Sequence, residues 1–245
     1  MRVLVAAGLD PSGGAGLLAD AQAIEAVGAR AWTVATALTA QGPGGARAFE
    51  PVPTRFVTAQ LDALLSGSER PCAAKTGMVG SAENAAAVAE ALGRPSLSRI
   101  PLVVDPVLAA SSGLPLLSGG PPREALWPLL ARAHLLTPNW PELEVLAGGP
   151  LADEAAATAA ARDLPCRAVL VKGGHRRGPP VDLLVRGRRV DRFAGRRRPG
   201  TARGTGCRLA SAIAGLLARG ETLEVAIRRA KRYVERYLDR EGSRS

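Results

Sequence analysis

Four consecutive residues near the carboxyl end of the chain, Gly204, Thr205, Gly206 and Cys207, stand directly before a helical pattern of apolar residues. The first turn of a helix carries unpaired backbone N–H groups and the positive end of the helix dipole, and glycine lets an anion approach closely. The four residues therefore predict an anion-binding loop. Since a helix N-terminus also favours a thiolate, Cys207 is a candidate base for a substrate hydroxyl. The alternative is a glycine-rich turn before a core helix, with Cys207 as a small packing residue.

Two further motifs carry groups that suit a nucleotide phosphate. In TPNWPE, Asn139 and Glu142 lie three residues apart just after a predicted strand, and oxygen ligands of this kind suit Mg²⁺, directly or through water. In VKGGH, Lys172 ends another strand before two glycines, where a compact charge reaches a phosphate oxygen. The alternatives are an ordinary helix N-terminus with an acidic first turn, and a surface lysine at a turn.

A glycine-rich segment, DPSGGAG at 10–16, lies between a predicted strand and a predicted helix. It has neither the spacing of a P-loop nor that of a dinucleotide fingerprint, so by itself it indicates only a close approach to the backbone. Taken together, the motifs supply an anion hole, a cation, a carboxylate suited to Mg²⁺ and a possible base. These are the requirements of phosphoryl transfer, which depends on positioning and charge neutralisation.

The elements that must position these groups alternate along the chain. We predict strands over 2–8, 31–38, 101–106, 134–139 and 167–174, helices over 14–28, 54–65, 81–92 and 223–238, and a hairpin over 181–193 that turns at Arg186 and Gly187. The alternation favours an α/β fold in one domain over 1–245, with a mostly parallel sheet covered on both faces. Asp10, Asp105, Asn139 and Lys172 end or follow strands, where such sheets bind ligands.

Composition excludes several classes of protein. Apolar residues make up 47% of the 245 residues, enough for a large core, and no run approaches the roughly 18 residues of a membrane span. The amino-terminal stretch is too short and too weakly charged for a secretory signal. The three cysteines form an odd set without metal-like spacing, which indicates reduced thiols in the cytoplasm, with Cys72 and Cys166 in the core.

The formal net charge of +10 raises the question of nucleic-acid binding. The basic residues are spread along the chain and concentrate only within 175–198, and no stacking-aromatic pattern accompanies them, so we expect no nucleic-acid partner. Only Lys75, Lys172 and Lys231 among the 32 basic residues are lysines. Either these positions need a compact charge rather than the arginine fork, or compositional drift has left three lysines.

Six segments occur in a recognisable order: AAGLDPSGGAGLLADAQAIEAVGARAWTVATALTAQ, KTGMVGS, VVDPVLAASSG, LLTPNWPE, VLVKGGH and GTGC. In these segments the chain resembles the hydroxymethylpyrimidine/phosphomethylpyrimidine kinases of thiamin synthesis, over about residues 3–238. The resemblance implies a ribokinase-like three-layer α/β/α fold, usually in a homodimer. It also implies ATP, Mg²⁺ and phosphorylation of 4-amino-5-hydroxymethyl-2-methylpyrimidine, of its monophosphate, or of both.

The resemblance further implies roles for single residues. The pyrimidine pocket matches Gly8, Asp10, Ala15, Gln41, Met78 and Val107, with Gln41 at the position that hydrogen-bonds the pyrimidine edge. The Mg–ATP positions match Asp105, Asn139, Glu142 and Lys172, with Asp105 and Glu142 as the candidate metal ligands. The anion hole matches Gly204, Thr205, Gly206 and Cys207, with Cys207 at the position of the catalytic base.

The chain departs from most of these kinases beside its anion hole, where Arg203 and Arg208 replace a histidine and a threonine. We hypothesise that both arginines add charge where a substrate phosphate lies and so favour the monophosphate, because arginine binds phosphate in a bidentate way. The alternative is that Arg208 points to solvent.

Two other functions remain open at this point. A pyridoxal kinase of the same superfamily acts on a similar flat heterocycle, although Gln41 and Met78 favour the pyrimidine. A non-catalytic pyrimidine-binding protein is disfavoured because Lys172, Glu142 and Cys207 are all retained.

Overall fold

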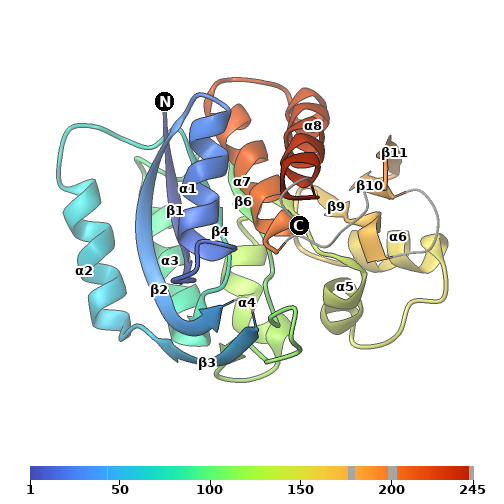
Figure 1. Ribbon diagram of the computed structural model, residues 1–245. Helices are drawn as coiled ribbons and strands as arrows, with labels where there is room; N and C mark the ends of the chain where they lie inside the picture. Colours follow the sequence, from blue (N-terminus) through green and yellow to red (C-terminus); the bar gives the residue numbers. More distant parts are fainter. Residues whose placement is uncertain (43, 176–179, 198–202, 243–245) are drawn as a thin grey trace.

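A nine-stranded sheet forms the centre of the computed structural model, which describes residues 1–245 except 43, 176–179, 198–202 and 243–245 (Figure 1). The strand order is β11-β10-β9-β8-β6-β4-β1-β2-β3. The strands of this sheet are β1 Arg2–Leu9, β2 Arg30–Gly42, β3 Gly45–Pro51, β4 Ala73–Thr76, β6 Leu102–Val104, β8 Leu135–Leu136, β9 Val169–Val171, β10 Val181–Arg186 and β11 Arg189–Ala194. A separate pair is formed by β5 Gly80–Ser81 and β7 Leu117–Ser118.

The six central strands pair in parallel, whereas β3, β10 and β11 add antiparallel pairs at the two ends of the sheet. The prediction of a mostly parallel α/β sheet is therefore confirmed. Successive side chains of β1 point to opposite faces: Val3, Val5 and Ala7 enter one core, and Leu4 and Ala6 enter the other. A strand buried on both faces reads as a continuous apolar run, as the first strand of this chain does.

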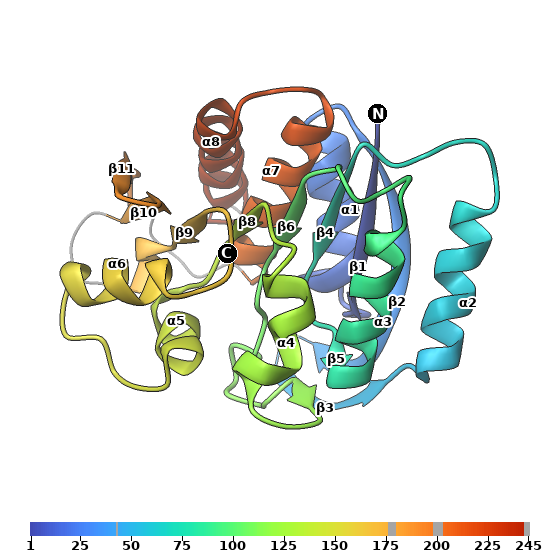
Figure 2. The same ribbon diagram turned by 180° about the vertical axis from the view of Figure 1, so that it is seen from behind.

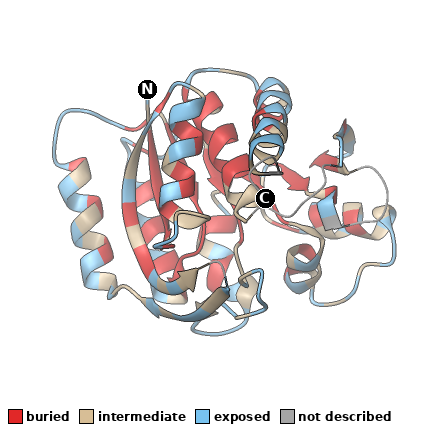
Figure 3. Ribbon diagram, viewed as in Figure 1, coloured by how far each residue is buried: buried red, intermediate tan, exposed pale blue. Residues whose placement is uncertain are grey.

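Helices cover both faces of the sheet, which gives three layers (Figures 1 and 2). They are α1 Gly16–Ala26, α2 Thr54–Leu65, α3 Ala82–Gly93, α4 Pro122–Leu130, α5 Trp140–Ala147, α6 Glu154–Arg162, α7 Thr205–Ala218 and α8 Leu223–Gly242, with a short 3₁₀ turn over Gly173–His175. The helices α1, α7 and α8 share one core, and α2 to α6 share the other. Figure 3 shows the burial concentrated in the sheet and in the helix faces turned towards it.

The predicted elements agree with the observed ones in most of the chain. The helix at 54–65 and the hairpin after residue 181 are confirmed, and the side chain of Ser81 accepts a hydrogen bond from the backbone of Asn84 at the start of α3. The strand predicted to end at 38 was too short, because β2 continues to Gly42 as one arm of a ribbon with β3. This extension carries Gln41 to the far end of the strand.

Among the described residues, no helix has the length and apolar character needed to cross a membrane. The three cysteines are free thiols. Cys72 and Cys166 are half-buried and pack against the margins of the two cores, rather than lying inside them as expected.

Candidate active site

A cavity of about 1040 Å³ lies at the carboxyl ends of the parallel strands. The fourteen residues singled out in the sequence all line it: Gly8, Asp10, Ala15, Gln41, Met78, Asp105, Val107, Asn139, Glu142, Lys172, Gly204, Thr205, Gly206 and Cys207. The fold thus brings together groups that are spread over 200 residues of the chain, as expected where parallel strands end at one edge. The role of each residue remains a prediction.

The glycine-rich loop before α7 packs directly on the glycine-rich loop before α1. Gly204 adopts a left-handed conformation with φ of +69°, and a Cβ atom added there would lie 2.2 Å from the carbonyl oxygen of Gly14. Only glycine fits both constraints. Because α1 begins at Gly16 and α7 begins at Thr205, the N-termini of two helices open at the same point. The loop in which an anion hole was predicted is therefore packed against a second glycine-rich loop that also begins a helix.

Cys207 lies at this meeting point and lines the cavity. Burial raises the pKa of its thiol to about 12, although Lys75 and a hydrogen bond from the backbone of Gly16 each lower it. Burial thus favours the neutral thiol more strongly than Lys75 and the Gly16 backbone favour the thiolate. A reaction that uses Cys207 as a base must therefore stabilise the thiolate by further charges.

Asp10 organises the first glycine-rich loop. One carboxylate oxygen accepts hydrogen bonds from the backbone and the hydroxyl of Ser12, at 2.9 and 2.7 Å. The other accepts from the backbone of Ala15 at 3.0 Å and from Arg203 Nη2 at 2.8 Å. Asp10 is buried, and these hydrogen bonds hold the loop that forms this wall of the cavity.

On the opposite side of the cavity, Lys172 lies between two carboxylates. Its Nζ atom lies 2.7 Å from Asp105 Oδ1 and 3.7 Å from Glu142 Oε2. It also lies 3.1 Å from the position of a Cβ atom added to Gly206. Burial alone lowers the pKa of Lys172, but Asp105 and Glu142 outweigh it and raise the pKa, so the ammonium stays charged. The alternative of a surface lysine is wrong, because its side chain is only 12% exposed.

Asn139 and Glu142 begin helix α5 as a capping box. Asn139 Oδ1 accepts from the backbone of Glu142 at 2.8 Å, and Glu142 Oε2 accepts from the backbone of Asn139 at 2.7 Å. The alternative interpretation of this motif, an ordinary helix N-terminus with an acidic first turn, is thus present in the structure. The capping box also holds the Glu142 carboxylate near Lys172. Burial raises the pKa of Glu142 to about 7, with Lys172 opposing this and Asp105 adding to it.

All three lysines of the chain line this cavity, and each is paired with a buried aspartate. The pairs are Lys75 with Asp20, Lys172 with Asp105, and Lys231 with Asp182. Sequence reasoning singled out the lysines but missed Asp20 and Asp182, which lie 55 and 49 residues from their partners. The only sequence signal was the scarcity of lysine among the basic residues.

The two arginines beside the anion hole lie in different places. Arg203 lines the cavity, where its Nη1 atom donates to the carbonyl oxygen of Gly42 at 2.7 Å. Arg208 is buried away from it, where it donates to the carbonyl oxygen of Ala19 at 3.0 Å and lies 4.2 Å from the ring centroid of Tyr237. The hypothesis that Arg208 reaches a substrate phosphate is wrong, as is the alternative that it points to solvent. One residue after Cys207, a helix has turned by about 100° away from the cavity.

Comparisons with known proteins decide the family. The profile described as phosphomethylpyrimidine kinase matches residues 10–243. The chain belongs to the phosphomethylpyrimidine kinase family. A hydroxymethylpyrimidine/phosphomethylpyrimidine kinase from Rhizobium meliloti is 39% identical in sequence to this chain. The alignment covers 93% of this chain and 86% of that relative. The thiamine biosynthesis bifunctional protein ThiED from Geobacter sulfurreducens is 43% identical over 95% of the chain, which spans only 48% of that relative.

Solved structures of related kinases share the fold of this phosphomethylpyrimidine kinase family member. The phosphomethylpyrimidine kinase of Clostridium difficile matches with a TM-score of 0.81 and 32% identity, over 97% of this chain and 99% of that one. A pyridoxal kinase from Staphylococcus aureus, in complex with AMP-PCP and pyridoxal, matches with a TM-score of 0.83 and 29% identity, over 96% and 86%. The predicted ribokinase-like three-layer fold is confirmed.

Proposed function

We propose that this chain uses ATP to phosphorylate 4-amino-5-hydroxymethyl-2-methylpyrimidine, its monophosphate, or both, and that residues 1–245 form one kinase domain. The observation that carries the proposal is the arrangement of the cavity. The N-termini of α1 and α7 lie on one side of it, and the Lys172 ammonium, shared by Asp105 and Glu142, lies on the other. Backbone N–H groups and a fixed cation are what a transferring phosphoryl group requires.

Different residues of the cavity have different roles in the proposed phosphoryl transfer. The N–H groups of Thr205, Gly206 and Cys207, at the start of α7, neutralise charge on the transferring phosphoryl group. Lys172 contacts a nucleotide phosphate from the opposite side. Cys207 accepts the proton of the substrate hydroxyl while the hydroxyl oxygen bonds to the γ-phosphorus and the bond to the leaving ADP breaks.

Mg²⁺ fits the donor set of this cavity as a partner of the nucleotide. Asp105 and Glu142 present two carboxylates to the same lysine, and the described residues contain no cluster of three metal-binding side chains. Such a pair suits Mg²⁺, which keeps several waters and takes other ligands from substrate phosphates. When bound, the ion would neutralise phosphate charge. Asn139 contributes by orienting Glu142, because its own side-chain oxygen caps α5.

The other end of the cavity suits a flat heterocycle. Met78 covers Gly8 so closely that a Cβ atom at Gly8 would lie 2.7 Å from the methionine sulfur. Gln41 and Val107 line the same region, and Gln41 supplies an amide for the edge of a ring. Arg203 is the one of the two unusual arginines that reaches this cavity, so a preference for the monophosphate rests on Arg203 alone.

Pyridoxal is the second candidate substrate, because a pyridoxal kinase holding pyridoxal and AMP-PCP superimposes on this chain. The deciding experiment measures ATP- and Mg²⁺-dependent ADP release with the hydroxymethylpyrimidine, its monophosphate and pyridoxal, beside a Cys207→Ala control. Turnover of either pyrimidine that the control lacks supports the proposal. Turnover of pyridoxal alone selects the second candidate, and no ADP release with any acceptor would favour a non-catalytic binding protein.

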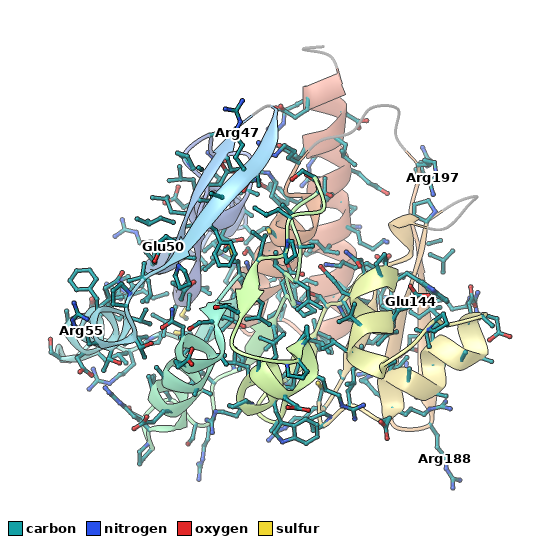
Figure 4. All side chains as sticks on the ribbon, turned by 90° about the horizontal axis from the view of Figure 1, so that it is seen from below. Arg47, Glu50, Arg55, Glu144, Arg188 and Arg197 are labelled. Carbon is teal, nitrogen blue, oxygen red and sulfur yellow. The ribbon has the colours of Figure 1, made fainter. Side chains whose placement is uncertain are left out.

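Three further predictions accompany this function: a homodimer, a cytoplasmic location and no nucleic-acid or membrane partner. Figure 4 shows Arg47 on β3, Arg55 on α2, Arg188 in the turn between β10 and β11, and Arg197 after β11, and all four are exposed. This spread of exposed arginines supports the prediction of no nucleic-acid partner. Sedimentation of the purified chain tests the dimer. Titration with duplex DNA at two salt concentrations tests the absence of a nucleic-acid partner, since such binding weakens steeply as the salt concentration rises.

A further inference from the structure

Lys75 is a fully buried lysine to which the proposed reaction gives no role. It lies on β4 with 0% of its side chain exposed, and its Nζ atom lies 2.8 Å from Asp20 Oδ2 on α1. The other oxygen of Asp20 accepts a hydrogen bond from Ser211 Oγ on α7 at 2.7 Å. Lysine is almost never fully buried unless it is paired, so the site is built around this contact.

The network lies one helical turn below the candidate base. Asp20 follows Gly16 by four residues on α1, and Ser211 follows Cys207 by four residues on α7. Residues four apart share one face of a helix. The contact between Gly16 and Cys207 in the first turn is therefore repeated by the contact between Asp20 and Ser211 in the second. Lys75 enters beneath them from the sheet and lines the same cavity as Cys207.

Stability does not account for a buried ion pair at this position. Removing two charges from water costs several kcal/mol per ion, and well-packed apolar residues of similar volume are often equally stable or more so. On the sheet, Lys75 has apolar neighbours, Val5 on β1 and Ala73 on β4. A charge maintained here points to a function that an apolar side chain lacks.

We propose that Lys75 is a positioning residue that stabilises the thiolate of Cys207, and that Asp20 limits the strength of this effect. The inference rests on the role proposed for Cys207. The thiol first loses its proton to solvent. The thiolate then takes the proton of the substrate hydroxyl as the hydroxyl oxygen bonds to the γ-phosphorus and the bond from that phosphorus to ADP breaks. Lys75 stays protonated throughout.

Four charged groups interact electrostatically with Cys207, two from elements of the fold and two from segments that follow strands. Lys75 from β4 and Lys172 from the segment after β9 favour the thiolate, whereas Asp20 from α1 and Asp105 from the segment after β6 oppose it. Lys75 acts more strongly on the thiol than Asp20 does. The two members of one ion pair therefore have opposite expected effects, which a merely structural role does not produce.

The test is the pH dependence of Cys207 alkylation by iodoacetamide, followed by mass spectrometry in a Cys72→Ala/Cys166→Ala background. The variants are Asp20→Asn, Lys75→Met and the double variant Lys75→Met/Asp20→Asn, which replaces both charges of the pair at once. A control, Lys231→Met/Asp182→Asn, removes the buried pair between α8 and β10. No nucleotide or pyrimidine is added, so this measurement is independent of whether the proposed substrates are turned over.

The expected order of alkylation rates at pH 8 is Asp20→Asn, then the wild type, then the double variant, with Lys75→Met slowest. About one pH unit, or tenfold in rate, should separate Asp20→Asn from the double variant. The control should titrate like the wild type. If Lys75→Met does not fold, the other two variants still decide the order. The inference is overturned if the folded double variant titrates like the wild type, or if Asp20→Asn slows alkylation.

Discussion

Lys172 and Asp105 form an ion pair in the cavity, with 2.7 Å between Nζ and Oδ1, and Glu142 shares the same ammonium. Two buried carboxylates thus depend on one cation. Lys172→Met should lower kcat/KM about 10²–10³-fold, the usual loss when one preorganised charge donor is removed from a reaction centre. Steady-state ADP release measures this change.

The substitution Lys172→Arg provides the matched test of shape. It keeps the charge, but a Cβ atom at Gly206 would already lie 3.1 Å from Nζ, so the wider guanidinium has no room beside the loop. We expect Lys172→Arg to remain at least tenfold below the wild type. Full activity in this variant would show that Lys172 supplies charge without a defined position.

Gly204 and Gly220 provide a second matched pair, because both have positive φ values, of +69° and +84°. An alanine Cβ atom at Gly220 would meet no atom within 4 Å. Its only penalty is that of a left-handed backbone conformation, which should lower the free energy of unfolding by about 1 kcal/mol. An alanine at Gly204 collides with the carbonyl oxygen of Gly14 and must push the two glycine-rich loops apart. We expect Gly204→Ala to lose most activity and Gly220→Ala to keep it, by ADP release and thermal unfolding. Equal activities in the two variants would contradict the proposed anion hole.

The sequence predicted the strand-to-loop positions of the site well, because strand ends are local features. Asp10, Asp105 and Lys172 each follow an apolar run, and a parallel sheet necessarily brings such ends to one edge. The helices that were missed lack a clear local signal. Helix α4 contains Pro128 in its interior, which normally ends a helix, and α6 is mostly alanine, which gives no strong apolar stripe.

The sequence does not predict which side chains and loops contact each other when they are far apart in the chain. Nothing near Lys75 points to Asp20, and neither the glycines at 13–16 nor those at 204–206 indicate that the two loops pack against each other. The burial that raises the pKa of the Cys207 thiol is invisible in the sequence for the same reason, because it depends on elements far away in the chain. Arg208 was misplaced because the register of α7 relative to α8 depends on packing.

Arg203 and Arg208 are expected to differ in what they control. Arg203→Ala should lower the ratio of kcat/KM for the monophosphate to that for the free alcohol about tenfold, since hydrogen bonds to charged groups contribute about 1.5–3 kcal/mol. Arg208→Ala should leave this ratio unchanged and lower Tm by several degrees, because it removes a buried guanidinium that contacts α1 and α8. An unchanged ratio in a folded Arg203→Ala variant would remove the basis for a monophosphate preference.

Glu142 should make stability depend on pH in a defined window. Its pKa is raised from 4.5 to about 7 by burial, so the folded state holds a proton that the unfolded state releases. The associated stabilisation is fully present below pH 4.5 and is lost as the pH rises to about 7. Glu142→Gln keeps the acceptor of the capping box but does not titrate. The free energy of unfolding of this variant, relative to the wild type, should therefore increase by roughly 2 kcal/mol between pH 4.5 and 7 and then level off.

Asn139→Ala is the control for this experiment, because it removes the other half of the same capping box without removing a titratable group. It should cost about 1 kcal/mol at every pH. Urea unfolding from pH 4.5 to 8 measures both variants against the wild type. Parallel curves for Glu142→Gln and the wild type would mean that Glu142 is ionised throughout this range, so that Lys172 outweighs its burial. Mg²⁺ binding would then release no proton from Glu142, whereas a carboxyl group that titrates near pH 7 must lose its proton before it can bind the ion.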